Sequence, residues 1–355
     1  MWLNPIYPTI NAAPFIALGY EMTADYYERI RIQGYSNLIG QIPWLVLSWF
    51  YAFMENKNLF ATDVEGARVL AILVGITVIG IGILPGIFCK EPFYTIAKIQ
   101  HTTPPGIFRH IAGFFRGFAI TLKNRRFLKL AGATFLVFNG FTIISGLGSY
   151  VIIFYVCGGD YGIGAKYIGL FGTTLSLCTF GAISIVTWMA TKIGKKESFL
   201  LSTTIAIVGY VLKWFCYRRG SPYLLFIPAP FIAFGLGGLF TTIGSMIADV
   251  CDQDELDNGY RREGTFGAIY WWMVKLGIAA ALGVSGYLLN ATGFLQELGT
   301  HQTERTLFLM RSFEIGLPII TYTLAIVLIT TYDLTPERVK EIRLELEQRR
   351  GKTTT

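Results

Sequence analysis

Residues 66–89, GARVLAILVGITVIGIGILPGIFC, carry a single charge, that of Arg68. A bilayer core of about 30 Å requires about 20 apolar residues in a helix, so this stretch predicts a membrane-spanning helix. The whole chain of 355 residues has the same character, with 53% apolar residues, 15% charged residues and a mean hydropathy of +0.49. Soluble proteins have about 25% charged residues, and disordered chains are poor in aromatics, which here reach 15%. The composition therefore predicts a membrane protein with several spans.

Similar apolar runs along the chain predict an all-α fold with about nine membrane-spanning helices. We expect them at residues 2–20, 36–53, 66–89, 127–156, 163–190, 198–216, 222–248, 265–289 and 307–331.

The distribution of basic residues predicts the orientation of these spans. Most of the 30 Lys and Arg residues lie in segments that alternate spans place on the same side of the membrane. Because Lys and Arg accumulate in cytoplasmic loops, we expect these segments and the C-terminus to be cytoplasmic, in a bacterial inner membrane. The net charge of +7 then follows from topology, and no nucleic-acid partner is expected.

The chain divides into four predicted parts. Residues 1–89 form three spans, residues 90–126 a cytoplasmic linker with an amphipathic helix at the interface, and residues 127–331 a six-helix bundle. Residues 332–355 form a tail, in which Thr335-Pro336-Glu337 has the residue types of a helix start. We expect the tail helix to be polar, with no apolar stripe wide enough to bury.

Two similar stretches indicate an internal repeat. Residues 21–29, EMTADYYER, follow the first predicted span, and residues 248–255, ADVCDQDE, follow the seventh, with basic residues after each. Both place acids in a loop at the cytoplasmic end of a helix. Equivalent loops six helices apart are what two parallel six-helix halves would produce.

The chain also resembles a known family. Residues 17–35, ALGYEMTADYYERIRIQGY, and residues 245–283, SMIADVCDQDELDNGYRREGTFGAIYWWMVKLGIAAALG, resemble the glycoside–pentoside–hexuronide:cation symporters, a branch of the major facilitator superfamily that includes melibiose permease. Residues 193–196 (IGKK) and 334–350 (LTPERVKEIRLELEQRR) are similar to the same family.

The resemblance implies a fold and a function. The nine spans resemble helices four to twelve of twelve, so we expect about three helices to precede Met1. The implied function is symport of a sugar or glycoside with Na⁺ or H⁺ by alternating access. The expected partners are a small solute and the lipid bilayer, with the protein a monomer and without a cofactor.

Lys275 is the principal candidate for the transport site. It lies about 12 Å into its predicted span, where a charge costs about 2.5–3.5 kcal/mol or more. The resemblance implies that this lysine lies in a central cavity beside the cation and the sugar. Tyr270 and Trp271 are candidates for stacking on a sugar ring, although tryptophan is also common at membrane interfaces. Asn11 belongs to the same predicted cavity, but it lies in a stretch without the acid that the family has there, so the coupling ion stays open.

Charged residues at predicted cytoplasmic helix ends suggest a gate. Asp25 and Arg29 have i, i+4 spacing and form one set. The other set is Asp249, Asp252, Arg261 and Arg262. Such charges would lock two halves together if partly buried, whereas exposed ion pairs are weak. Near the outer end of the last span, Arg311 and Glu314 are expected to form an interfacial pair.

The sequence also leaves other functions open. One alternative keeps the fold and changes the cargo to a lipid-like or other amphiphilic solute, and another is a truncated fragment that does not transport. A membrane enzyme is not expected, because the sequence lacks the motifs and the clustered intramembrane acids or histidines that such an enzyme would require. The five cysteines and three histidines have no metal-ligand spacing, so no metal site is expected.

Overall fold

The computed structural model describes residues 26–47, 50, 53, 60, 62–88, 121–259, 262–299 and 301–350. Within this part, the regular elements are helices and there are no strands. Their bounds are α2 Tyr26–Leu47, α4 Asp63–Phe88, α7 Arg125–Tyr150, η1 Val151–Val156, α8 Tyr161–Ile193, α9 Lys195–Cys216, η2 Pro222–Phe226, α10 Ala229–Asn258, α11 Glu263–Ala291, η3 Gln296–Leu298, α12 Glu304–Thr330 and α13 Pro336–Arg350.

Short polar side chains start several of these helices. The side chain of Asn124 accepts hydrogen bonds from the backbone N–H groups of Arg126 and Phe127, both at 3.1 Å. Asp160 accepts from Ile163 N at 2.9 Å at the start of α8, and Thr303 begins α12 in the same way. These side chains satisfy N–H groups that have no partner within the first helical turn.

Seven described segments are long and apolar enough to cross a membrane: Val64–Leu84, Arg125–Val156, Gly162–Ile193, Lys195–Cys216, Pro222–Asn258, Glu263–Ala291 and Glu304–Thr330. They confirm the third to ninth predicted spans. The first predicted span lies outside the described residues. The second was predicted to start at residue 36, but α2 begins at Tyr26, because a helix satisfies its backbone hydrogen bonds internally whatever the polarity of its side chains.

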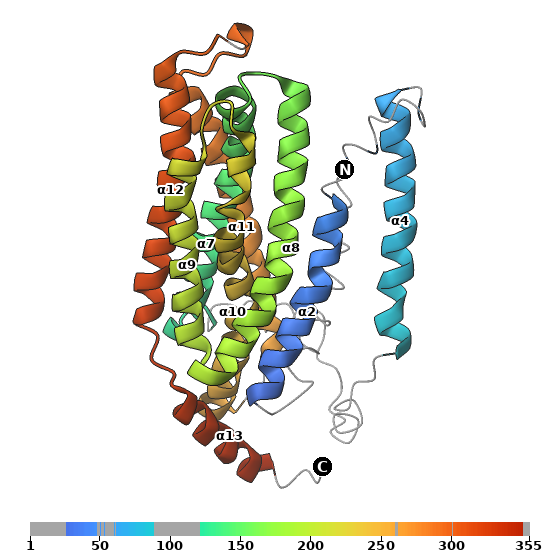
Figure 1. Ribbon diagram of the computed structural model, residues 1–355. Helices are drawn as coiled ribbons and strands as arrows, with labels where there is room; N and C mark the ends of the chain where they lie inside the picture. Colours follow the sequence, from blue (N-terminus) through green and yellow to red (C-terminus); the bar gives the residue numbers. More distant parts are fainter. Residues whose placement is uncertain are drawn as a thin grey trace.

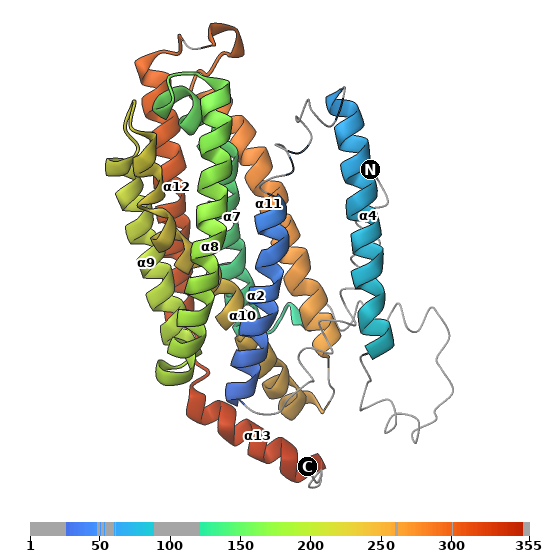
Figure 2. The ribbon, with the colours of Figure 1, turned by 45° about the vertical axis from the view of Figure 1, so that its right-hand side comes forward.

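Helices α7 to α12 form one bundle, which Figures 1 and 2 show from two directions. Helix α10 packs against α8 and α9, and α7 packs against α11 and α12. Helix α2 lies against α8 and α10, whereas α4 stands apart from the bundle in both views. Helix α13 runs across one end of the bundle, which we call the α13 end; the opposite end carries η1 and is called the η1 end.

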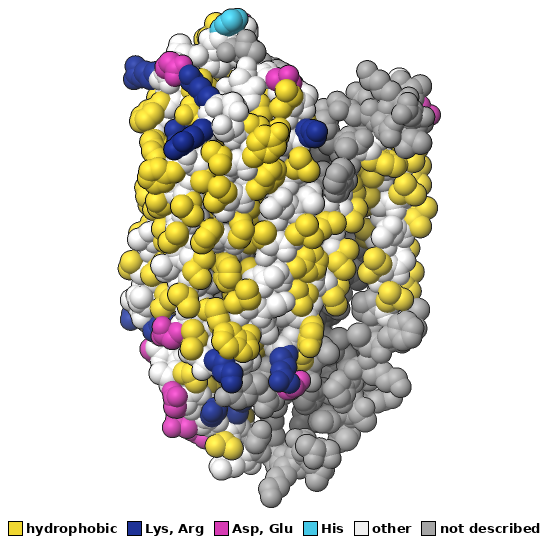
Figure 3. Space-filling view, in the orientation of Figure 1, with side chains coloured by type: hydrophobic (Ala, Val, Ile, Leu, Met, Phe, Trp, Pro, Cys, Tyr) yellow, Lys and Arg dark blue, Asp and Glu magenta, His cyan; other side chains and the backbone are white. Residues whose placement is uncertain are grey.

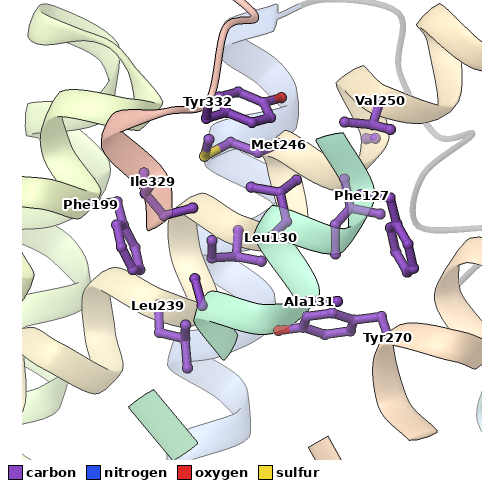
Figure 4. Close-up of a cluster of buried hydrophobic side chains, with 14 of the residues drawn as sticks. Phe127, Leu130, Ala131, Phe199, Leu239, Met246, Val250, Tyr270, Ile329 and Tyr332 are labelled. Atoms are coloured by element: carbon purple, nitrogen blue, oxygen red, sulfur yellow. The ribbon is translucent and has the colours of Figure 1, made fainter. Parts of the chain in front are cut away.

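The core of the bundle is built around α10, in which every residue from Thr241 to Asp254 is buried. Figure 4 shows side chains from α7, α9, α10, α11 and α12 meeting in this core, including Phe127, Phe199 and Tyr270. Close approach between α9 and α10 depends on Gly238, where an added Cβ would lie 1.9 Å from Ser202 Oγ. Small residues of this kind let membrane helices pack closely.

The molecular surface fits a membrane environment. Figure 3 shows hydrophobic side chains over the middle of this face, with Lys, Arg, Asp and Glu toward its two ends. The protein is therefore an integral membrane protein, with an apolar band and two polar ends.

Candidate functional site

The α13 end of the bundle holds a cluster of charged side chains. Its first member, Lys195, opens α9 directly after Gly194, which has a φ of +94° and joins α8 to α9 without further residues. Few residues other than glycine adopt this conformation. The sharp turn places the Lys195 side chain under α10, where Nζ lies 2.5 Å from Asp249 Oδ2 and 3.4 Å from Ser245 O.

Arg343, from α13, reaches the same acid from another direction. Its Nη2 lies 3.2 Å from Asp249 Oδ1, and its Nε lies 3.6 Å from Asp252 Oδ2. None of these three side chains is more than 11% exposed. Asp249 therefore lies between a lysine of α9 and an arginine of α13, and the two acids balance the two cations. We call Lys195, Asp249, Asp252 and Arg343 the end cluster.

Apolar contacts hold α13 in place for this interaction. Val339, Ile342 and Leu346 are 3%, 0% and 5% exposed and belong to the main core. The prediction that this helix has no stripe to bury was therefore wrong. Spacings of three and four residues put the three side chains on one face of α13. This face is narrow, but it is buried because the end of the bundle covers it.

The acidic residues after residue 248 lie at an end of the bundle, as predicted. They belong to a helix, however, and not to a loop. The expected loop after residue 248 is helical as far as Asn258, and the helix ends at Gly259, which has a φ of +73°. Asp249 and Asp252 thus point from successive turns of a rigid helix. A left-handed glycine after the last helical residue is a common helix end.

One of the two predicted basic partners, Arg262, binds a different acid. Arg262 forms a two-pronged interaction with Asp254, with Nη2 2.7 Å and Nε 3.0 Å from Asp254 Oδ2. This pair joins the end of α10 to the start of α11 and does not involve Asp249 or Asp252. Asp254 was not among the predicted site residues, although it belongs to the same acidic stretch. Arg261 lies outside the described residues.

The first predicted set of gate residues is only partly described. Asp25 lies outside the described residues, and Arg29 is in α2, where its side chain is not described. The path of α2 is clear, because Asn37 Nδ2 lies 3.5 Å from Thr241 Oγ1 and an added Cβ at Gly34 would lie 2.6 Å from Thr187 Oγ1. Helix α2 thus crosses the bundle on α8 and α10.

Lys275 lies on the exposed face of α11. It is about 18 Å along the helix from Glu263 and close to the middle of α11. Trp271, one turn earlier on the same face, is 37% exposed. Tyr270 is 3% exposed and lies about 140° around the helix from Lys275, inside the core, so the two do not share a surface. Asn11 lies outside the described residues.

A buried ion pair between α9 and α12 was missed. Lys213 Nζ contacts Glu314 Oε1, and their side chains are 1% and 0% exposed. The lysine also lies 4.8 Å from the centre of the Tyr217 ring. Glu314 therefore pairs with Lys213, and not with Arg311 as expected. Arg311 donates to Tyr155 OH at 3.0 Å and contacts the carbonyl oxygen of Trp214.

Comparison with known proteins places this architecture in a family. The family model described as "MFS/sugar transport protein" matches residues 6–336. The chain is 27% identical over 180 residues to the isoprimeverose transporter of Lactiplantibacillus pentosus, a match that covers 49% of this chain and 36% of that protein. It is 26% identical over 172 residues to the glucuronide carrier protein homolog of Escherichia coli (strain K12), covering 48% and 37%.

One human relative is named for a different kind of solute, a lipid. The chain is 22% identical over 244 residues to the sodium-dependent lysophosphatidylcholine symporter 1 of Homo sapiens, covering 68% of this chain and 43% of that protein. In each of these three comparisons the chain spans less than half the length of the relative. The match of the family model over most of the chain, with the helix bundle described above, shows that the chain belongs to the MFS/sugar transport family and, within it, to the glycoside–pentoside–hexuronide symporters.

Proposed function

We propose that this protein is a secondary active transporter that moves a sugar or glycoside together with Na⁺ or H⁺ by alternating access. The single observation that carries this proposal is the family match over residues 6–336. The names of the bacterial relatives support a sugar-like solute, because they refer to isoprimeverose and a glucuronide. They also favour a transporter over an enzyme.

The exposed face of α11 is the proposed wall of the transport path. A lysine in the middle of a membrane-length helix is costly in lipid, so such residues usually face a polar cavity. Lys275 provides a positive charge on this face, and Trp271 provides an aromatic ring one turn away. Together they offer a hydrogen-bond donor and a stacking surface, which suit a hydroxylated ring. Tyr270 is left out of this proposal because it is buried in the core.

The end cluster is the proposed core of the gate. Its two acids are on α10, which also contacts α2, so a shift of α10 would affect both the cluster and the α2 interface. Removing one partner of a buried ion pair is costly because it leaves a buried charge unpaired, so a second arrangement would have to give each acid another basic partner. The cluster can therefore favour a closed α13 end while permitting a second arrangement. Asp25, Arg29 and Arg261 remain proposed partners in that arrangement.

The proposed location is a bacterial inner membrane with the α13 end in the cytoplasm. The basic segments of the chain support this orientation. The proposed working form is a monomer in contact with lipid.

Uptake into vesicles tests the proposed function. The purified chain is reconstituted into liposomes, and entry of labelled isoprimeverose is measured with an inward Na⁺ gradient, an inward H⁺ gradient, or neither. We expect accumulation above the equilibrium level with one of the two gradients. Uptake that never exceeds that of protein-free liposomes would contradict the proposal and favour a fragment that does not transport alone.

A lipid-like solute is the second candidate, and the similarity to the human lysophosphatidylcholine symporter favours it. The same liposomes would be tested with labelled lysophosphatidylcholine and a Na⁺ gradient. Accumulation of this lipid without accumulation of the sugar would replace the first proposal by the second.

A further inference from the structure

A cavity with a volume of about 480 Å³ lies at the η1 end of the bundle. Its walls come from η1 and the turn after it, from the turn after α9, and from the start of α12. The lining includes Phe154, Tyr155, Cys157, Arg219, Gln302 and Glu304. This site is distinct from the end cluster, which lies at the opposite end of the same helices.

Two turns bring the walls together. Gly158 and Gly220 have φ values of +67° and +71°, and the N–H of Gly220 donates to Val156 O at 3.1 Å. This bond ties the turn after α9 to the end of η1. It places the Arg219 guanidinium 5.1 Å from the centre of the Tyr155 ring.

Tyr155 is held from a second side. The guanidinium of Arg311 also lies 5.1 Å from the centre of its ring, and Arg311 donates to the Tyr155 hydroxyl at 3.0 Å. The third wall is fixed by Gln302, whose Nε2 donates to Leu295 O at 2.6 Å and to Gly299 O at 3.2 Å. Walls that are already ordered reduce the entropy that binding would otherwise cost.

The charges at the rim select the kind of ligand. Arg219 Nη2 lies 2.7 Å from Glu304 Oε2, so the rim carries one positive and one negative charge in contact. An anion would be repelled by Glu304, and a cation by Arg219. The pair still has guanidinium donors and carboxylate lone pairs to offer, which is what the hydroxyl groups of a neutral polyol require.

We propose that this cavity binds a neutral, polyhydroxylated ring compound such as a sugar, as a first docking site separate from the proposed path along α11. Its volume lies within the range of about 300–1,000 Å³ of small-molecule sites. The role in uptake rests on the proposed function, whereas binding itself does not. Few direct contacts are available at an open rim, so the affinity is weak, with a Kd of about 1–10 mM.

Cys157 provides a native reporter of occupancy, because it lines the cavity. The test uses the chain in lipid nanodiscs, free of glycoside detergents, with Cys89, Cys178, Cys216 and Cys251 replaced by serine. The rate of Cys157 alkylation by a maleimide is measured with and without methyl α-D-xylopyranoside, isoprimeverose, glucuronate or phosphocholine. Burial raises the pKa of the Cys157 thiol, so every arm is run at one alkaline pH, about 8.5.

Neutral sugars should slow alkylation, by about tenfold at a concentration ten times the Kd. Glucuronate and phosphocholine should slow it much less. No protection by either neutral sugar would overturn the proposal, and protection by phosphocholine alone would replace it with a lipid-headgroup site. Protection equal for all four probes would show that no selective site exists.

Two variants identify where the protection arises. Replacing Arg219 and Glu304 together by glutamine keeps the rim neutral but removes its strongest donors and acceptors, so protection should fall at least fivefold while the rate without sugar stays the same. Lys275→Ala should leave protection unchanged, and its loss in that variant would assign the effect to α11 and overturn the proposal. Protection without uptake would refute the transport function alone, and uptake without protection would refute the docking site alone.

Discussion

At the scale of single residues, the Lys213–Glu314 pair has the largest expected effect on stability. Both side chains are inaccessible, so losing either leaves a buried charge without its partner. Lys213→Ala should reduce the free energy of unfolding by about 3–5 kcal/mol, and replacing both residues by methionine should recover most of that loss. Thermal unfolding in detergent micelles would measure both effects.

An exposed pair serves as the control for this prediction. Arg338 and Glu341 are 46% and 60% exposed at i, i+3 in α13. Arg338→Ala should leave the unfolding midpoint unchanged, because exposed pairs contribute little. A double variant of Lys213 and Glu314 as unstable as the single one would show that the pair acts through packing and not through charge.

Lys275 has a predicted effect on transport and not on folding. Lys275→Ala should insert normally and lose gradient-driven sugar uptake, since its charge is the proposed polar group of the path along α11. Uptake at equal expression, beside the matched variant Lys192→Ala near the end of α8, measures this. Accumulation by Lys275→Ala equal to that of the unaltered chain would remove Lys275 from the mechanism.

At the scale of elements, α13 should control access to the end of α10. Cys251 on α10 is 4% exposed and lies between Asp249 and Asp252 in sequence, so its alkylation reports opening of the end cluster. Arg343→Ala should raise that alkylation rate about tenfold or more, because each 1.4 kcal/mol removed from an opening free energy changes it tenfold.

Lys340 provides the matched position for this measurement. It is on an exposed position of the same helix, so Lys340→Ala should leave the Cys251 rate unchanged. Ile342→Ser should raise the rate as Arg343→Ala does, because it weakens the apolar attachment of α13. If all three variants had the same Cys251 alkylation rate as the unaltered chain, the end cluster would have no part in closing the α13 end.

The stability contributed by the connection between α12 and α13 should decrease at acidic pH. Arg126 donates to Asp333 through Nε and Nη2 at 3.0 and 2.9 Å, and this interaction holds the pKa of Asp333 below its usual range. A lowered pKa in the folded state means that the contribution is present above the ordinary carboxyl pKa of about 3.9 and is lost as the pH falls through the folded value. The Asp333 side chain is 56% exposed, so the contribution is below about 1 kcal/mol.

Unfolding midpoints at pH 6 and at successively lower pH, compared with those of Asp333→Asn, would test this expectation. The difference between the two proteins should shrink toward zero with falling pH. A difference that grows on acidification would give the interaction the opposite sign.

The sequence predicted the elements better than their ends and partners. Apolar runs identified the spans from residue 66 onward, because membrane helices need both length and hydrophobicity. The π-helical turn η1 at Val151–Val156 has no such signal, since it continues the apolar run of α7. From the sequence, Lys213 looks like a basic residue beside a loop, because it lies one turn from the end of α9. Only the packing of α12 shows that it is buried. The spacing of Val339, Ile342 and Leu346 was readable, but the surface that covers them was not.

At the scale of the whole molecule, the two ends of the bundle should lie on opposite sides of the membrane. Cys157 is at the η1 end, and Glu345 is exposed on α13. In sealed right-side-out vesicles, an impermeant maleimide should label Cys157 directly and Glu345→Cys only after permeabilisation, with the remaining cysteines replaced by serine. Labelling of both sites before permeabilisation would contradict the proposed topology.

The attachment of α13 also has a consequence for biosynthesis. The ribosome makes this helix after every helix of the bundle, yet Arg343 and Ile342 belong to interactions at the end of α10. Until they emerge, the nascent chain has Asp249 and Asp252 without one of their partners and an apolar bundle end open to water. That end therefore cannot close before α13 has been made, and a premature stop codon before Pro336 should yield a chain that inserts but is handed to membrane quality-control proteases.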